Sequence, residues 1–181
     1  MYQSLLRDSR LFDLLLRFDG ELAAETRRGG CECGGVLHSA RYQRKPRGGP
    51  CGLGAECCVR DSFCCATCRL RATPPSLRFL GRKVFFGALV LLIPVLRDGP
   101  TAERLSRLCT TFAVSVRTVR RWCRYWRETF VASRQWEAMR GLFAAPLSAD
   151  DMPRSLLEAF SKISDTRDRL VAVLRLVSLP R

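Results

Sequence analysis

The chain has 181 residues, 47% of them hydrophobic, which is enough for one ordinary domain or two small ones and excludes general disorder. The size leaves no room for a large enzyme with appended modules. A formal net charge of +14 indicates a polyanionic partner, with nucleic acid favoured over an anionic membrane surface. The segment from Arg69 to Arg127 contains thirteen Arg or Lys but only two acidic residues, so the positive charge is concentrated in one part of the chain.

Neither the N-terminal residues nor the apolar run at 84–96 predicts export or a membrane span. The start lacks the layout of a signal peptide, because Asp8, Arg10 and Asp13 interrupt any apolar stretch. The apolar run at 84–96 contains Pro94 and is shorter than the roughly 20 residues that a membrane span needs. Ten cysteines, several in close pairs, favour metal-bound thiolates in a reducing compartment over a secreted disulfide scaffold. We therefore expect a cytoplasmic protein without membrane contact.

Apolar residues recur at helical spacing from Leu5 to Leu22 and predict an N-terminal helix within residues 1–28. Residues 29–75 read instead as short strands and turns, punctuated by paired glycines and by prolines. A stiff Thr-Pro-Pro-Ser boundary at 73–76 follows, since residues that precede proline are disfavoured in helices. Beyond it helices are expected over residues 82–96, 101–112, 115–131, 133–143, 153–162 and 165–177.

Two close cysteine pairs stand near the ends of the strand-rich segment. Cys31 and Cys33 lie in Cys-x-Cys-Gly-Gly, and Cys65 and Cys68 form a Cys-x-x-Cys. Four thiolates supplied by two such knuckles suit a tetrahedral structural zinc ion, and the glycines let backbone amides turn toward the sulfurs. The sequence therefore predicts a zinc ribbon over residues 29–75.

The ligand set has alternatives. Cys64 could replace Cys65, and His38 could replace either member of the first pair. The remaining cysteines are expected to be incidental thiols or a second metal site in a hairpin tip (Cys51, Cys57, Cys58) and small buried residues on helix faces (Cys109, Cys123). Catalytic zinc is not favoured, because the His-x-Glu and Pro-Cys-x-x-Cys elements of base deaminases are absent from the sequence.

Residues 105–126 have the pattern of a helix-turn-helix. A turn at Ala113-Val114, where glycine is usual, leads to Ser115, a natural N-cap for a second helix. Apolar residues of that helix share one face, and arginines occupy the others. We expect base-edge contacts from Val116, Arg117, Thr118 and Arg121, and phosphate contacts from Arg120 and Arg124. The alternative is an arginine-coated solvent face of a bundle helix.

Aromatic residues follow in the same region. Their helical spacing favours core positions over a platform that stacks single-stranded bases (Trp122, Tyr125, Trp126, Phe130 and Trp136).

These motifs together resemble the N-terminal DNA-binding part of bacterial insertion-sequence transposases, and small zinc-ribbon/helix-turn-helix proteins of mobile elements. The likeness covers roughly residues 30–130 and rests on four motifs. They are Cys31-x-Cys33-Gly34-Gly35, Phe63-x-Cys65-x-x-Cys68-x-x-Arg71, Thr73-Pro74-Pro75-Ser76 and the Val-Ser-x-x-Thr-Val-x-Arg-Trp that begins at Val114. The resemblance implies that Cys31, Cys33, Cys65 and Cys68 hold zinc, and that ribbon and helices recognise the ends of an element.

A transposase of that kind also has a nuclease domain, for which about fifty residues after Phe130 leave no room. His38 is the sole histidine, and no phosphate-binding loop is present, so we expect a non-catalytic protein. The predicted fold is α+β: an N-terminal helix (1–28), a zinc ribbon (29–75), a helix-turn-helix domain (76–145) and a C-terminal helical segment (146–181).

The favoured function is sequence-directed binding of double-stranded DNA by an accessory or regulator of a mobile element. A basic face running through Arg71, Arg78 and the helix at 115–127 would favour it. The alternatives are a transcriptional regulator, an RNA-binding ribbon, and an adaptor for a partner transposase or recombinase. An adaptor could dock its partner through exposed apolar residues of the last helix, which otherwise pack on the core (Leu170, Val171, Val173, Leu174 and Val177).

Overall fold

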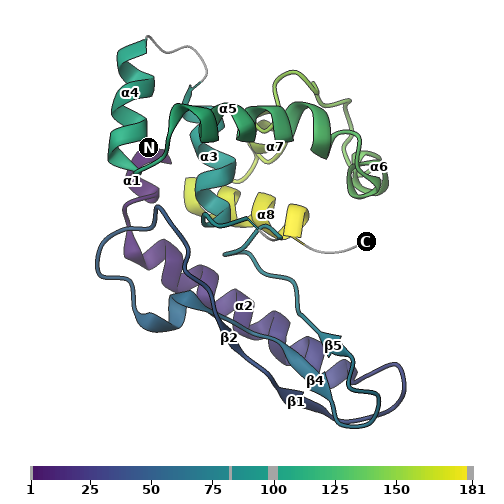
Figure 1. Ribbon diagram of the computed structural model, residues 1–181. Helices are drawn as coiled ribbons and strands as arrows, with labels where there is room; N and C mark the ends of the chain where they lie inside the picture. The colour runs from purple at the N-terminus through teal and green to yellow at the C-terminus, as the bar shows by residue number, and fades with distance from the viewer. Residues whose placement is uncertain (1, 82, 98–101, 179–181) are drawn as a thin grey trace.

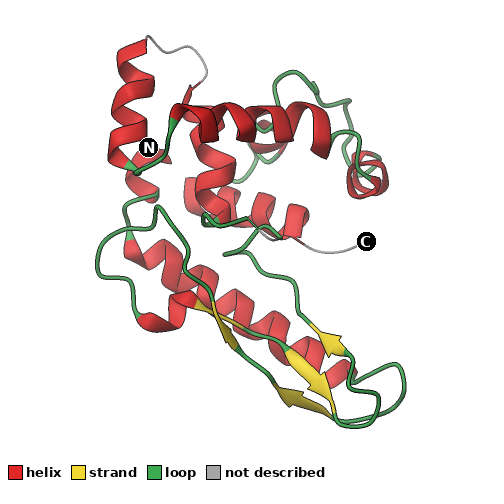
Figure 2. Cartoon of the chain, in the orientation of Figure 1, coloured by secondary structure: helices red, strands yellow, loops and turns green. Residues whose placement is uncertain are grey.

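The computed structural model describes residues 2–81, 83–97 and 102–178. Short strands lie beside the long helix α2 (Ser9–Gly29), and the later helices are gathered at the other end of the molecule (Figures 1 and 2). This is the α+β class expected from the sequence. Figure 1 shows that α2 extends from the helical part along the strands.

The predicted N-terminal helix is interrupted. Helix α1 covers Tyr2–Leu5, and α2 begins at Ser9 because the Asp8 carboxylate accepts a hydrogen bond from the Arg10 backbone N–H at 3.0 Å. The first half of α2 buries Leu11 and Phe12 in the main hydrophobic core, whereas Ala23 near its other end packs in a second, small core. One helix thus supports both parts of the structure.

The ribbon consists of two small antiparallel sheets. Strands β1 (Leu37–Ser39), β4 (Phe63–Cys65) and β5 (Arg71–Ala72) form one in the order β1-β4-β5. Strands β2 (Tyr42–Gln43) and β3 (Val59–Arg60) form the other, with the short helix η1 (Ala55–Cys58) before β3. In β4, side chains alternate between faces, so Phe63 and Cys65 are buried with Leu37 and Ala23.

A buried ion pair connects α2 to the segment that leaves the ribbon. The carboxylate of Asp19, 1% exposed, accepts hydrogen bonds from the Leu77 backbone N–H, the Ser76 hydroxyl and Arg78 Nε, the last at 2.7 Å. The Arg78 guanidinium, 0% exposed, also donates to the carbonyls of Glu56, Cys57 and Val59 at 2.9–3.0 Å. The basic face through Arg71, Arg78 and the helix at 115–127, which would have favoured DNA binding over an adaptor, therefore does not include Arg78.

Helix α3 (Gly87–Arg97) is the centre of the helical part. Its residues 88–93 are at most 1% exposed, as expected for a helix that is apolar all round. The predicted start at 82 is wrong for the described residues, because Phe85 forms an isolated parallel bridge with Arg47, whose N–H donates to the Val84 carbonyl at 3.0 Å. Residue 82 itself lies outside the described residues.

Pro94 in α3 leaves a backbone carbonyl free to bind a side chain of the π-helix η2 (Tyr125–Phe130). Pro94 has no N–H, so the carbonyl of Val90, four residues earlier, lacks its usual helical donor. The indole Nε1–H of Trp126 donates to that carbonyl at 2.8 Å, and Trp126 is fully buried. The buried tryptophan thus supplies the hydrogen-bond donor that the buried proline cannot.

The other predicted helices are present with shifted ends. The helix predicted over 115–131 is α-helical only in its first part and continues as a π-helix, a form with i→i+5 hydrogen bonds that is rare and short in proteins. Residues 98–101, which include the predicted start of the preceding helix, lie outside the described residues. The elements are α4 (Ala102–Thr111), α5 (Val116–Arg124), the π-helix η2 (Tyr125–Phe130), α6 (Arg134–Arg140), α7 (Arg154–Ala159) and α8 (Thr166–Ser178).

Candidate metal centre and nucleic-acid interface

The structure brings together the four cysteines predicted from the two pairs. The sulfurs of Cys31, Cys33, Cys65 and Cys68 all lie within 4.8 Å of one another, and three of their separations are 3.5 Å. A tetrahedral zinc ion with Zn–S bonds of about 2.3 Å would hold its sulfurs about 3.8 Å apart. A disulfide would instead need sulfurs about 2.05 Å apart. These cysteines could therefore bind a metal ion.

The alternative ligands lie outside this cluster. His38 and Cys64 are opposite each other in the pairing of β1 with β4, one position away from the Leu37–Cys65 pair and so on the other face of the sheet. The Cys64 thiol donates to the Arg69 carbonyl at 3.5 Å. In the described part of the chain, no second group of metal-ligating side chains includes Cys51, Cys57 or Cys58.

The backbone around Cys65 favours a thiolate. Hydrogen bonds from the backbone N–H groups of Cys68 and Thr67 lower the pKa of the Cys65 thiol to about 6, against an opposing effect of burial. Zinc binds thiolates and not thiols, so this environment suits a metal ligand. Gly35 approaches from the other side, where a Cβ atom would lie 2.5 Å from Cys65 Sγ and 2.7 Å from Thr67 Oγ1.

We predict that Gly35→Ala impairs metal binding, because the added methyl group would occupy the space of the Cys65 sulfur. The expected result is at least a tenfold loss of affinity, of the order seen when the surroundings of metal ligands are altered. Titration with cobalt(II), followed by its thiolate charge-transfer absorption, measures this. Gly54→Ala is the matched control, since a Cβ there meets no atom within 4 Å. Equal affinities for the two variants would contradict the prediction.

The helix-turn-helix is formed by α4, the four residues 112–115 and α5. The Val114 N–H donates to the Cys109 carbonyl at 2.9 Å and closes the end of α4. Ala113 has φ of 49°, the left-handed conformation in which glycine is usual. The predicted N-cap is confirmed, because the Ser115 hydroxyl accepts a hydrogen bond from the Thr118 N–H at 3.2 Å.

Ala113→Gly should stabilise the protein, because an L-residue in the left-handed region costs roughly 1–2 kcal/mol and glycine loses only part of this through its greater freedom. We expect the free energy of unfolding in urea to rise by about 0.5–1 kcal/mol. Ala24→Gly, at an exposed interior position of α2, is the control and should lower it by about 1 kcal/mol. A decrease for both variants would show that the turn is not strained.

Helix α5 presents its arginines to solvent. Val116, Arg117, Arg120, Arg121 and Arg124 are exposed and Thr118 is half-buried, while Val119, Trp122 and Cys123 are buried. All six residues predicted to contact DNA are thus accessible on one helix. The aromatic residues predicted to be core are 7% exposed or less, apart from the half-buried Tyr125 (Trp122, Trp126, Phe130 and Trp136).

A groove of about 840 Å³ runs beside α5. Arg121 and Arg124 line it together with Lys83 and with Arg47, which lies in the ribbon loop, residues 44–54 between β2 and η1. The Lys83 ammonium lies 3.5 Å from the centre of the Tyr125 ring. Burial, together with the neighbouring Arg121, lowers the pKa of Lys83. Arg47 and Lys83 could not be recognised as site residues from the sequence, because only the tertiary contact between the ribbon loop and residues 84–85 brings them to α5.

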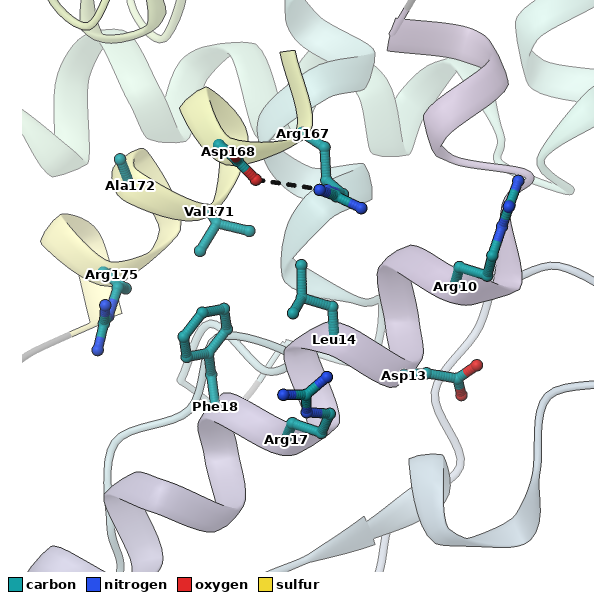
Figure 3. Close-up of a pocket in the computed structure, with 10 residues that line it drawn as sticks. All are labelled: Arg10, Asp13, Leu14, Arg17, Phe18, Arg167, Asp168, Val171, Ala172 and Arg175. Atoms are coloured by element: carbon teal, nitrogen blue, oxygen red, sulfur yellow. Dashed lines mark hydrogen bonds and ion pairs between the residues drawn. The ribbon is translucent and has the colours of Figure 1, made fainter. Parts of the chain in front are cut away.

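A second groove, of about 550 Å³, separates α2 from α8 (Figure 3). Four arginines line it, against three arginines and one lysine in the first groove, but Asp13 and Asp168 accompany them, and Arg167 Nε donates to Asp168 at 3.4 Å. Its apolar floor includes Phe18, over which Arg175 stacks at 4.7 Å. Positive charge is thus partly neutralised here. The two grooves share no lining residue.

The apolar residues of α8 that an adaptor would use are not accessible. All five are 7% exposed or less and belong to the main core (Leu170, Val171, Val173, Leu174 and Val177).

Across the described residues, none of the helices has the length and apolar character to cross a bilayer. Comparisons with protein-family models, curated proteins and solved structures found no match for the chain.

Proposed function

We propose that this protein binds double-stranded DNA through α5, with a structural zinc ion in the ribbon. The observation that carries the proposal is the helix-turn-helix geometry itself. A capped helix follows a left-handed turn and exposes arginines along one side, with its apolar side anchored in the core. The net charge of +14 supports a polyanionic partner.

In this proposal the first turn of α5 enters the major groove. Arg117 and Val116 are exposed there, and arginine can bind guanine O6 and N7 with two hydrogen bonds. The four-cysteine cluster holds zinc, which stabilises a ribbon whose own core is very small. The protein acts without catalysis, as an accessory or regulator of a mobile element. That last part rests on the likeness of its motifs to transposase DNA-binding regions.

Selection from a pool of random-sequence duplexes tests the proposal. We expect enrichment of a defined motif, and a decrease in affinity by a factor of about 10³ or more between about 50 and 200 mM salt. Arg117→Gln should change the preferred base at one position, with a cost of about 1–3 kcal/mol. Failure to enrich any motif, together with weak salt dependence, would refute duplex DNA as the ligand.

A second candidate is an adaptor for a transposase or recombinase. It is favoured by two exposed apolar side chains next to the cysteine cluster, Val36 at 65% and Leu70 at 68% exposure. The Ala66 N–H donates to the carbonyl of Val36, and the Cys65 N–H to that of Leu70. Loss of DNA binding on substitution of α5, but not of Val36, would favour the first candidate.

A further inference from the structure

The groove beside α5 is built from three segments that are distant in the sequence. The ribbon loop contributes Arg47, the extended segment before α3 contributes Lys83, and α5 contributes Arg121 and Arg124. The hydroxyl groups of Ser115 and Thr118 also line it and can donate hydrogen bonds. The groove therefore joins the ribbon to the helix-turn-helix.

Its charge is uncompensated. No acidic residue lines the groove, and none of its four cations forms an ion pair with a carboxylate in the part of the chain that the structure describes. The α2–α8 groove provides the comparison, since two aspartates line it and one of them binds an arginine. Four neighbouring cations without counter-charges repel one another, so an anion in this groove would be favoured on electrostatic grounds.

The groove is also held in place before any ligand arrives. Besides the hydrogen bond from Arg47 N–H to Val84, Arg44 of the same loop donates to the carbonyl of Lys83 at 2.7 Å. Gly48 lies so close to Leu89 that a Cβ atom there would overlap its side chain. The Tyr125 ring supports the Lys83 ammonium. The Lys83 ammonium, held in this way, loses little conformational freedom on binding.

We propose that this groove binds the phosphodiester backbone of the DNA strand next to the major groove entered by α5. The inference rests on the proposed function and deepens it, because it assigns Arg121 to phosphate instead of to a base edge. It also makes the ribbon loop part of the DNA interface through Arg47. Base reading is left to the exposed residues at the start of α5, among them Val116 and Arg117.

If the cations of this groove bind phosphates, removing one of them should lower the affinity for every DNA sequence by the same factor. A residue that reads a base would instead affect only the preferred sequence. The probes are the duplex enriched from the random pool and a scrambled duplex of the same composition, both titrated over a range of salt. Arg47→Gln, Lys83→Gln and Arg121→Gln should each weaken binding to both probes by the same factor, and reduce the salt slope by about 1. Arg17→Gln, in the α2–α8 groove, should bind like the wild type, and Lys83→Arg should restore most of the affinity.

Different results would contradict the phosphate-binding groove and the proposed DNA-binding function. If Arg121→Gln weakens only the enriched duplex, it reads a base and the inference is wrong. Wild-type affinity of Arg47→Gln and Lys83→Gln would also overturn it. Metal content and urea unfolding of each variant identify any that fail to fold, and the substitutions of the exposed Arg47 and Arg121 then serve as the folded tests of charge. If the wild type itself shows no salt-dependent duplex binding, or binds single strands or RNA equally well, the proposed function fails instead.

Discussion

Replacing Arg78 by methionine should lower the free energy of unfolding by about 3–5 kcal/mol, the range for breaking a buried ion pair by removing one partner. Methionine fills a similar volume next to Phe79, so the loss would come from charge and hydrogen bonds. The Asp19 carboxylate would be left buried without its cation, and three backbone carbonyls would lose their donor. Urea unfolding of the two proteins, with metal bound, measures the difference.

Arg41→Met is the matched control. Arg41 pairs with Asp61 at 2.7 Å, the same distance as in the buried pair, but its side chain is 56% exposed. Water screens the exposed Arg41 guanidinium, although the Asp61 side chain is only 12% exposed, so this variant should lower the free energy of unfolding by less than Arg78→Met does. Equal effects of the two substitutions would show that burial of the Asp19–Arg78 pair is not what stabilises the fold. Asp19→Leu combined with Arg78→Met should recover part of the loss, because no unpaired charge remains.

Removal of the metal should unfold the ribbon while the helices around α3 persist. Structural zinc sites contribute apparent free energies of about 10–16 kcal/mol, far more than the small core around Leu37 and Phe63 can supply. We expect about one zinc ion per chain. After chelation, amide exchange should become fast over residues 31–72 and stay slow in α3.

Cys65→Ser should reproduce the effect of chelation, because Cys65 is fully buried and is one of the four cysteines of the cluster. Cys51→Ser, at an exposed cysteine outside the cluster, should behave like the wild type. A protein that carries no metal and whose ribbon amides are unaffected by chelators would refute the zinc site. Loss of protection in α3 as well would mean that the two cores unfold together.

Local signals explain which elements could be predicted. The cysteine pairs act through spacing of two or three residues, and the Ser115 cap acts within a single turn, so both are visible in the sequence. Strand alternation then decides between Cys64 and Cys65, but only the observed register with β1 shows which of them faces Ala23. The strand-rich segment was predictable as a unit, and its pairing was not.

Long-range contacts explain the errors. Arg78 reads as a surface cation until Asp19, 59 residues earlier, supplies its buried partner. The start of α3 shifts because the ribbon loop pairs with Val84 and Phe85, which overrides their position in a run of helical character. The missed interruption at Asp8 has a different cause. The N-cap at Asp8 is a local signal, but a strong apolar periodicity runs across it and predicts one continuous helix.

The match between Pro94 and Trp126 has a consequence for the surface. A helix packed only by apolar side chains can rotate slightly about its axis. The hydrogen bond from the Trp126 indole to the Val90 carbonyl fixes the helix that continues from α5 in one orientation about its axis. That orientation determines where Arg121 and Arg124 point, two to five residues before the tryptophan. A buried proline therefore sets the direction in which the positive charge of α5 faces, and substitution of Pro94 would act on the proposed DNA interface without touching it.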